Sequence, residues 1–383
     1  MSWVYTSSGR VRDAYAAGLL RQMLEIRSPS YAEEELAVYL AEVMNSLGFA
    51  AYVDGVGNVV GSIGRGTGPT IMLLGHMDTV AGDVAVRSAA GRLYGRGAAD
   101  AKGPLATMIS AAASSRDFAG RIVVVGAVEE ETPCSRGAMA IRNTHDRPDV
   151  CIIGEPSGWS TVVLGYKGKL DLRYQARCAP THPSSPAAKA SELAFECWAA
   201  VKEALGEVDH TAFHLPGVTL DSISGDTATA VADLSIRTPP GFCVATLLDN
   251  VRRRLPAGDL TVVNSVTACR ADRRNPAVRA LSAGIRRQMA QPSVAVKTAT
   301  SDMNTLAEVW DVPMATYGPG DSKLDHADDE HIVLADYFRA IAVLSHALSE
   351  LATQPATAHA TAPPIPVQPT APPQTTVPQP SGL

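Results

Sequence analysis

Imidazole and carboxylate side chains follow three short apolar runs of this sequence. His76 and Asp78 come after the first run, the glutamates 129–131 after the second, and Glu155 after the third. Adjacent carboxylates repel one another strongly, and at the end of an apolar strand they are explained best by a cation that neutralises them. The repeated pattern predicts a metal centre whose ligands are carboxylate oxygens and imidazole nitrogens.

Two further candidate ligands lie in glycine-rich segments. Asp100 lies in GRGAADAKG, residues 95–103, which opens a predicted helix, and a carboxylate there can bridge two cations because each oxygen can bind one. His326 ends the segment YGPGDSKLDH, residues 317–326, and loops of this kind often carry functional residues. Nitrogen and oxygen ligands without thiolates suit Zn²⁺, Co²⁺ or Mn²⁺.

Asp78 is better interpreted as a partner of His76 than as a metal ligand. Residues two apart on a strand project to the same face of a sheet. A carboxylate beside a metal-bound histidine commonly holds the second ring nitrogen and so fixes the tautomer. We therefore expect Asp78 to orient His76.

Alternating strands and helices are predicted to position these residues. Apolar, β-rich runs bounded by glycine or proline predict strands, and longer runs with helical spacing predict helices between them. This order implies an α/β fold with a largely parallel sheet, whose functional residues lie at the carboxyl ends of its strands. The predicted strands are residues 70–74, 122–128 and 151–153, and the predicted helices are residues 11–26, 31–47, 104–113 and 334–351.

The chain exceeds the roughly 250–300 residues at which a single core usually stops growing, so more than one domain is expected. Residues 167–274 change to a pattern of alternating strands and two helices, which predicts an inserted antiparallel α+β domain. Residues 1–166 and 275–351 then form the two parts of a catalytic domain. Residues 352–383 hold nine of the 26 prolines and are expected to form a disordered tail.

Composition excludes several classes of protein. The net charge of −6 and the absence of a dense lysine and arginine excess argue against a nucleic-acid binder. No run approaches the roughly 18 apolar residues of a membrane span. The six cysteines are scattered without a CxxC pair, and no secretion signal is recognised, so a reduced, cytoplasmic protein is expected.

Five motifs occur in an order typical of one enzyme family. They are GHMDTV, GRGAADAKGP, EEETPCSRGA, IGEPS and YGPGDSKLDHADDEH. With them the chain resembles the di-zinc deacylases and exopeptidases that include acetylornithine deacetylase and succinyl-diaminopimelate desuccinylase. The resemblance implies two Zn²⁺ ions, a zinc-exopeptidase-like catalytic domain, a ferredoxin-like lid and dimerisation domain, and a homodimer.

The resemblance also implies metal-binding roles. His76 would bind one zinc, Asp100 would bridge, and Glu155 would complete the first site. Glu131 and His326 would hold the second zinc.

The general base is expected in the glutamate run. Glu130 would take a proton from the attacking water and return it to the leaving amine. The three consecutive glutamates also permit a register in which Glu129 is the base and Glu130 is the ligand.

His182 matches the position of a histidine that stabilises the oxyanion and often comes from the second subunit of a dimer. The segment PTHPSS departs from the commoner form of this motif because Pro183 is inserted. An ordinary surface position for His182 remains the alternative.

Other residues are expected near the substrate. Ser301, Asp302 and Asn304 are predicted to line its pocket, and Arg237 is placed near a bound carboxylate. Lys167 lies at a predicted domain junction, where it either meets an acidic carrier protein or is solvated.

Within the family, the chain is most similar to LysK-type hydrolases, which release lysine or ornithine from a small acidic amino-group carrier protein, LysW. The motifs LYGRGAADAKGPLAT, LGYKG and TSDMN suggest this. The alternatives are a deacetylase or dipeptidase that acts on free small molecules, and a catalytically dead scaffold. The scaffold is disfavoured because every ligand position is filled.

Overall fold

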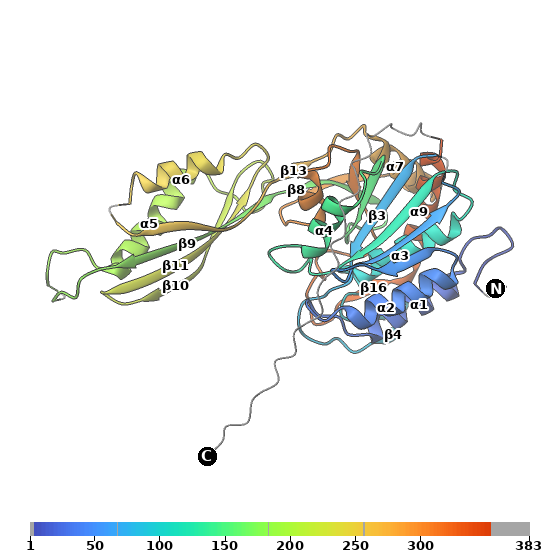
Figure 1. Cartoon of the computed structure of the whole chain (residues 1–383), viewed down its shortest axis with the longest axis horizontal. Helices are drawn as coiled ribbons and strands as arrows, with labels where there is room; N and C mark the ends of the chain where they lie inside the picture. Colours follow the sequence, from blue (N-terminus) through green and yellow to red (C-terminus); the bar gives the residue numbers. More distant parts are fainter. Residues whose placement is uncertain (1–3, 67, 183, 256, 354–383) are drawn as a thin grey trace, which may run out of the picture.

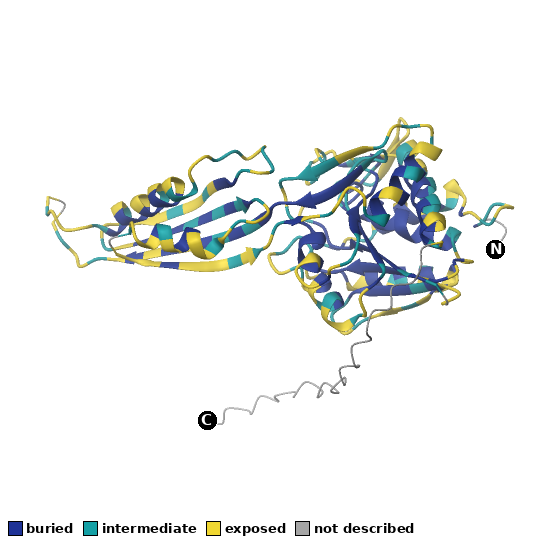
Figure 2. Cartoon of the chain, turned by 90° about the horizontal axis from the view of Figure 1, so that it is seen from above, coloured by how far each residue is buried: buried dark blue, intermediate teal, exposed yellow. Residues whose placement is uncertain are grey.

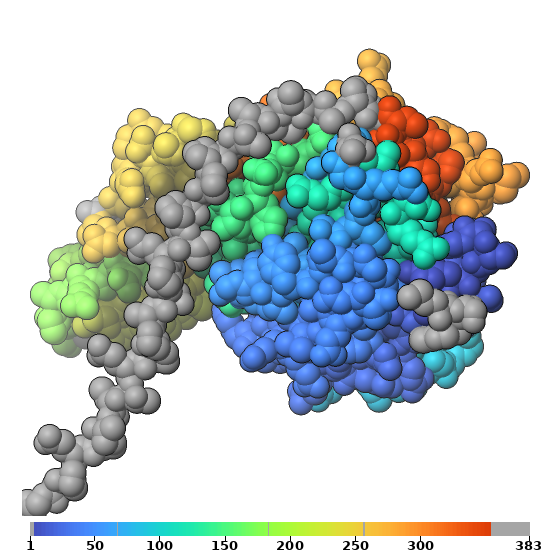
Figure 3. All heavy atoms as spheres, turned by 45° about the vertical axis from the view of Figure 1, so that its right-hand side comes forward, coloured from blue at the N-terminus to red at the C-terminus, as the bar shows by residue number. Residues whose placement is uncertain are grey.

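The computed structural model describes residues 4–66, 68–182, 184–255 and 257–353, and the predicted tail beyond residue 353 lies outside these ranges. The chain folds into a larger lobe and an elongated inserted lobe, residues 168–266, which projects from one side of it (Figure 1). The space-filling view shows the inserted lobe as a separate body beside the larger lobe (Figure 3). None of the described helices has the length and apolar character needed to span a membrane.

A nine-stranded mixed sheet forms the centre of the larger lobe. Its strand order is β1-β2-β6-β3-β7-β15-β8-β13, and β14 pairs with β8. The central strands β6, β3, β7 and β15 run parallel, whereas the pairs at the β1 edge are antiparallel. The strands of this sheet are β1 Ala50–Val53, β2 Val59–Gly64, β3 Thr70–His76, β6 Arg121–Ala127, β7 Val150–Gly154, β8 Thr161–Tyr166, β13 Cys269–Arg270, β14 Ser293–Lys297 and β15 Met314–Thr316.

Both faces of the sheet are covered, which explains why its central strands are apolar throughout. Ile71 and Leu73 of β3 face a core shared with α1, α2, α3, α7 and α9, while Met72 and Leu74 face a second core shared with α4 and α8. The α/β fold predicted from the sequence is therefore confirmed.

The helices of the larger lobe are α1 Asp13–Glu25, α2 Glu34–Ser46, α3 Lys102–Ser114, α4 Arg136–Thr144, α7 Pro276–Arg287, α8 Asp302–Ala307 and α9 Leu334–Leu351. A second, small sheet consists of β4 Arg87–Ala89, β5 Arg92–Tyr94 and β16 His331–Val333.

The inserted lobe has the β-α-β-β-α-β order of a ferredoxin-like fold. Its antiparallel sheet has the order β10-β11-β9-β12, and its helices share a core with one face of that sheet. Figure 2 shows buried and exposed residues alternating along these strands. Its elements are β9 Gly168–Arg177, α5 Ala190–Leu205, β10 Gly217–Gly225, β11 Thr229–Thr238, α6 Val244–Arg252 and β12 Asp259–Val266.

The chain crosses between the lobes near Lys167 and again near Thr267, and a single side chain holds both crossings. The Asn304 amide nitrogen donates to the carbonyl of Lys167 at 3.1 Å and to that of Thr267 at 2.8 Å. Glu308 accepts a bond from the Thr267 amide at 3.2 Å. Helix α8 and the residue that follows it therefore anchor both connections.

Candidate metal centre

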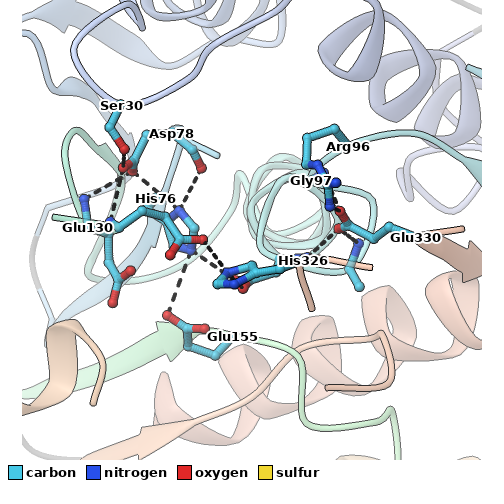
Figure 4. Close-up of polar contacts among 12 residues, drawn as sticks. Ser30, His76, Asp78, Arg96, Gly97, Glu130, Glu155, His326 and Glu330 are labelled. Carbon is cyan, nitrogen blue, oxygen red and sulfur yellow. Dashed lines mark hydrogen bonds and ion pairs between the residues drawn. The ribbon is translucent and has the colours of Figure 1, made fainter. Parts of the chain in front are cut away.

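Parallel strand pairing brings three of the predicted sites to one edge of the sheet. Strand β3 lies between β6 and β7, with His76 opposite Ala127 and Gly75 opposite Gly154. His76 ends β3, while Glu130 and Glu155 lie just beyond the ends of β6 and β7. Their side chains converge in the close-up of this edge (Figure 4).

His76 is the buried centre of this cluster, with a relative exposure of 1%. Its Nε2 lies 3.2 Å from an oxygen of Asp100 and 3.9 Å from an oxygen of Glu155. Its Nδ1 lies 2.9 Å from the main-chain carbonyl of Asp78 and 3.4 Å from the Asp78 carboxylate. Asp78 therefore contacts Nδ1 of His76, the ring nitrogen that faces away from the other acids. The main-chain carbonyl of Asp78 makes a closer contact than its carboxylate does.

His326 approaches the same cluster from the loop between β15 and β16. Its Nε2 lies 3.0 Å from an oxygen of Glu131 and 3.4 Å from Oδ2 of Asp100. The other oxygen of Asp100, Oδ1, is the one that faces His76. The Asp100 carboxylate thus lies between two imidazoles and presents one oxygen to each.

The donor atoms of this cluster fit divalent metal ions. One atom each from His76, Asp100 and Glu131 lies within 4.8 Å of the others, and the same holds for His76, Glu130 and Glu155. Imidazole nitrogens and carboxylate oxygens at this separation form the ligand set that zinc and related cations accept.

Burial and mutual repulsion disfavour the charged forms of most carboxylates in the cluster. Burial and the neighbouring Glu155 raise the pKa of Glu130 well above its usual value, and burial with Asp100 does the same for the pKa of Glu155. Burial and Asp100 also raise the pKa of Glu131. Contacts with the two imidazoles outweigh the burial of Asp100 and lower its pKa. A bound cation would compensate these repulsions, which supports the metal assignment.

The loop after β6 separates the three glutamates. Asp78 accepts the main-chain N–H groups of Glu130 and Glu131, both at 3.0 Å, and also the hydroxyl of Ser30 at 2.8 Å. The carboxylate of Glu129 instead accepts the Nε–H of Arg136 at 2.8 Å. Glu130 and Glu131 therefore join the cluster, while Glu129 is engaged outside it.

Sequence reasoning did not identify Glu330, whose carboxylate holds the Asp100 loop. Glu330 accepts the N–H groups of Gly97, Ala99 and Asp100 at 3.0, 2.9 and 3.0 Å, and it pairs with Arg96 at 2.9 Å (Figure 4). Its exposure is 1%. The only signal in the sequence is a further acid four residues after the predicted ligand His326.

A cavity of about 380 Å³ opens beside the cluster. Ser301 and Arg237, both expected near the substrate, line it. Asp302 and Asn304, also expected near the substrate, are almost fully buried, and neither is among the lining residues that the structure describes. The Asn304 amide is instead engaged by main-chain groups, and burial raises the pKa of Asp302 to about 7.

Two other predicted residues lie away from the cluster. His182 is on the loop between β9 and α5 of the inserted lobe, where its Nδ1 lies 2.7 Å from the hydroxyl of Ser184, and it does not line the cavity. Lys167 was expected to be solvated or to face a carrier protein. It is buried, and its ammonium donates to the carbonyl of Asp209 at 3.3 Å.

The chain is similar to known proteins over most of its length. The family model described as peptidase family M20/M25/M40 matches residues 72–350. LysW-lysine hydrolase of Deinococcus radiodurans is 42% identical over 357 residues, which cover 88% of this chain and 98% of that protein. A putative LysW-lysine/LysW-ornithine hydrolase of Thermococcus kodakarensis is 38% identical and covers 87% of this chain and 91% of that protein.

Solved structures share the fold at low sequence identity. A tripeptidase from Staphylococcus aureus superposes with a TM-score of 0.78 at 18% identity, covering 90% of this chain and 100% of that chain. An M20 family metallo-carboxypeptidase from Sulfolobus solfataricus superposes with a TM-score of 0.73 at 18% identity, covering 88% and 99%.

Proposed function

The chain belongs to peptidase family M20/M25/M40, and we propose that within it the protein is a two-zinc hydrolase that frees lysine, ornithine or a related diamino acid from a LysW-type carrier protein. As a member of this family it is a hydrolase that uses divalent metal. The observation that carries the proposal is the Asp100 carboxylate, which presents one oxygen to His76 and the other to His326. The relatives of similar length named as LysW-lysine hydrolases support the substrate.

The residues divide into two ligand sets around Asp100. His76 and Glu155 would complete the first metal site, and Glu131 and His326 would complete the second. Co²⁺ or Mn²⁺ would suit the same ligands. When bound, the two cations would acidify a water molecule and polarise the amide carbonyl.

Glu130 is the general base in this proposal. It lies with His76 and Glu155 in the cluster, where its carboxylate would take a proton from water and return it to the leaving amine. The alternative register, with Glu129 as the base, is disfavoured because the Glu129 carboxylate pairs with Arg136.

The cavity lining supports a substrate that carries negative charge. Lys169, Arg237 and Lys297 all line the cavity beside the carboxylate cluster. The α-carboxylate of the amino acid that is released would bind beside Arg237, its predicted contact. A small acidic carrier protein linked through a glutamyl side chain would add further negative charge.

The inserted lobe would act as a lid and as the dimerisation surface. Within one chain, His182 stays on a distant loop of this lobe, so its proposed role as oxyanion donor requires a second copy of the chain. A homodimer would provide it. We place the reaction in the cytoplasm, since all six cysteines are free.

A direct comparison of two substrates tests the proposal. The purified, metal-loaded protein is mixed with lysine linked to the carrier protein and, separately, with acetylornithine. We expect turnover of the carrier-linked lysine, with a rate that falls as salt screens the contacts between the proteins. Exclusive turnover of the acetylated compound would instead assign the protein as a small-molecule deacetylase.

A further inference from the structure

Two of the three cations that line the cavity have no acidic partner. Lys169 pairs with Asp171 at 3.1 Å. In the part of the chain that the structure describes, no carboxylate lies within 4.0 Å of the charged nitrogens of Arg237 or Lys297. Partly buried cations without counter-ions are costly, so the two unpaired cations indicate that the cavity receives anionic groups.

The first pair of cations belongs to the inserted lobe. Arg237 on β11 lies directly opposite Lys169 on β9, whose ammonium is paired with Asp171. The Arg237 guanidinium donates a long bond of 3.3 Å to the hydroxyl of Thr300. A carboxylate bound beside Arg237 would give the guanidinium an ion-pair partner.

Lys297 lies on a different element, at the end of β14 in the larger lobe. Its ammonium donates to the Pro156 carbonyl at 3.3 Å and to the Ser322 hydroxyl. These partners belong to the loops that carry Glu155 and His326, so the charge of Lys297 is fixed next to the proposed metal centre.

The contacts of Lys297 leave it able to bind a ligand. An ammonium group has three N–H donors, and the two described bonds use two of them, both with uncharged acceptors. The charge of Lys297 favours the ionised form of the nearby Asp325 carboxyl. The two groups nevertheless lie farther apart than an ion pair. One donor and a charge without an ion-pair partner therefore remain.

We propose that Lys297 forms a second anion subsite, which binds a carboxylate on the acyl side of the bond that is cleaved, while Arg237 binds the carboxylate of the amino acid that is released. This inference rests on the proposed function and specifies its substrate as an N-acyl amino acid whose acyl group carries its own carboxylate. A glutamyl group attached through its side chain is such an acyl group, whereas an acetyl group is not. Lys297 would thus distinguish carrier-linked substrates from acetylated ones.

A pair of matched substrates tests the subsite. One is lysine whose α-amino group is linked to the side-chain carboxyl of N-acetylglutamate, and the other is the same compound with the glutamyl α-carboxylate converted to a carboxamide. For the wild-type enzyme we expect kcat/KM to be about 10- to 100-fold higher for the acid, the value of a charge-assisted hydrogen bond. Lys297→Met should remove this preference, so that the variant has equal kcat/KM for the acid and for the carboxamide.

The matched control is Lys323→Met, which removes an exposed lysine from the same region and should retain the full preference. A Lys297→Met variant that loses activity equally on both substrates, or that keeps the preference, would overturn the subsite. A measurement on the wild-type enzyme covers the case in which the variant does not fold. N-acetylglutamate should inhibit about tenfold or more strongly than its α-carboxamide, and equal inhibition would contradict the proposal.

The same substrates separate this inference from the proposed function. If the acid is preferred but carrier-linked lysine is not hydrolysed, the subsite stands and the carrier function fails. If carrier-linked lysine is hydrolysed without a preference for the acid, the carrier function stands and the subsite fails.

Discussion

The carboxylate of Glu330 accepts the main-chain N–H of Asp100 at 3.0 Å, across 230 residues of sequence. Asp100 is the acid that lies between the two imidazoles, so Glu330 sets the position of the group that both proposed metal sites share. The bonds to Gly97 and Ala99 fix the rest of the same loop.

Glu330→Gln should weaken metal binding. The glutamine amide group would face main-chain N–H groups that the carboxylate now accepts, so the Asp100 loop would shift. We expect metal affinity to fall about 10- to 100-fold, the usual effect of changing a group that holds a ligand, as measured by titration of the metal-free protein with Co²⁺. Glu350→Gln, an exposed change on α9, is the control. Unchanged Co²⁺ affinity in Glu330→Gln would show that the loop is held without this carboxylate.

Glu130→Gln should abolish turnover without removing the metals. Loss of a general base typically costs about 10²- to 10⁴-fold in rate, while the ligand atoms of the two proposed sites stay in place. Metal content by elemental analysis and kcat on carrier-linked lysine are the measurements. Glu129→Gln is the matched comparison and should change kcat less than about fivefold, because the Glu129 carboxylate faces Arg136 outside the cluster. The reverse result, an active Glu130→Gln and an inactive Glu129→Gln, would move the base to Glu129.

The metal-free protein should lose stability as the pH rises from 6 to 9. Asp100 contacts raise the pKa of His326 from 6.5 to about 9, and burial raises the pKa of Asp325 to about 8 and that of Asp302 to about 7. The folded form therefore holds these protons more tightly than the unfolded chain does. Below the pKa that each group has in the unfolded chain, the bound proton contributes its full stabilisation of the folded form. This stabilisation is lost as the pH rises through the pKa that the group has in the folded protein.

Thermal unfolding with and without metal measures this effect. We expect Tm of the metal-free protein to fall by roughly 3 °C or more between pH 6 and pH 9. Added Co²⁺ should raise Tm more at pH 8 than at pH 6, because the cation replaces protons in the cluster. A metal-free Tm that rises over this range would contradict the assigned pKa directions.

Mixing two inactive variants tests whether the active site is shared between subunits. His182→Ala lacks the proposed oxyanion donor, and Glu130→Gln lacks the base. In a mixed dimer, one site would combine an intact Glu130 with the partner's intact His182. After exchange of subunits, activity should recover to about a quarter of the wild-type value, since half the dimers are mixed and each holds one complete site. No recovery, although mixed dimers are demonstrated by a tag on one variant, would show that His182 does not act on the active site of the partner subunit.

The central part of the fold could be predicted because its strands are buried on both faces. Continuous apolar runs mark β3, β6 and β7, and the helix predicted at residues 334–351 has the same bounds in the structure. The strands expected in the inserted domain, residues 169–178, 228–236 and 260–268, do not include β10. It is an edge strand of the inserted lobe with mostly exposed residues, so solvent rather than a core determines its sequence.

The candidate site could be located from residues whose own atoms are the proposed ligands. His76, Asp100, Glu155 and His326 stand next to strand ends or glycine-rich turns that are visible in the sequence. Glu330 could not be found in this way, because its partners are main-chain N–H groups that any residue would offer. The contacts of Asn304 were missed for the same reason, since they depend on how distant segments pack.

The Asn304 amide holds together the two connections between the lobes. The strands that cross at Lys167 and Thr267 cannot turn independently without breaking a bond to it. Ser301, which lines the cavity, is tied to the same side chain through its main-chain N–H at 3.0 Å. A rotation of the inserted lobe that displaced either connection would therefore also disturb the bond that holds Ser301 in the cavity wall.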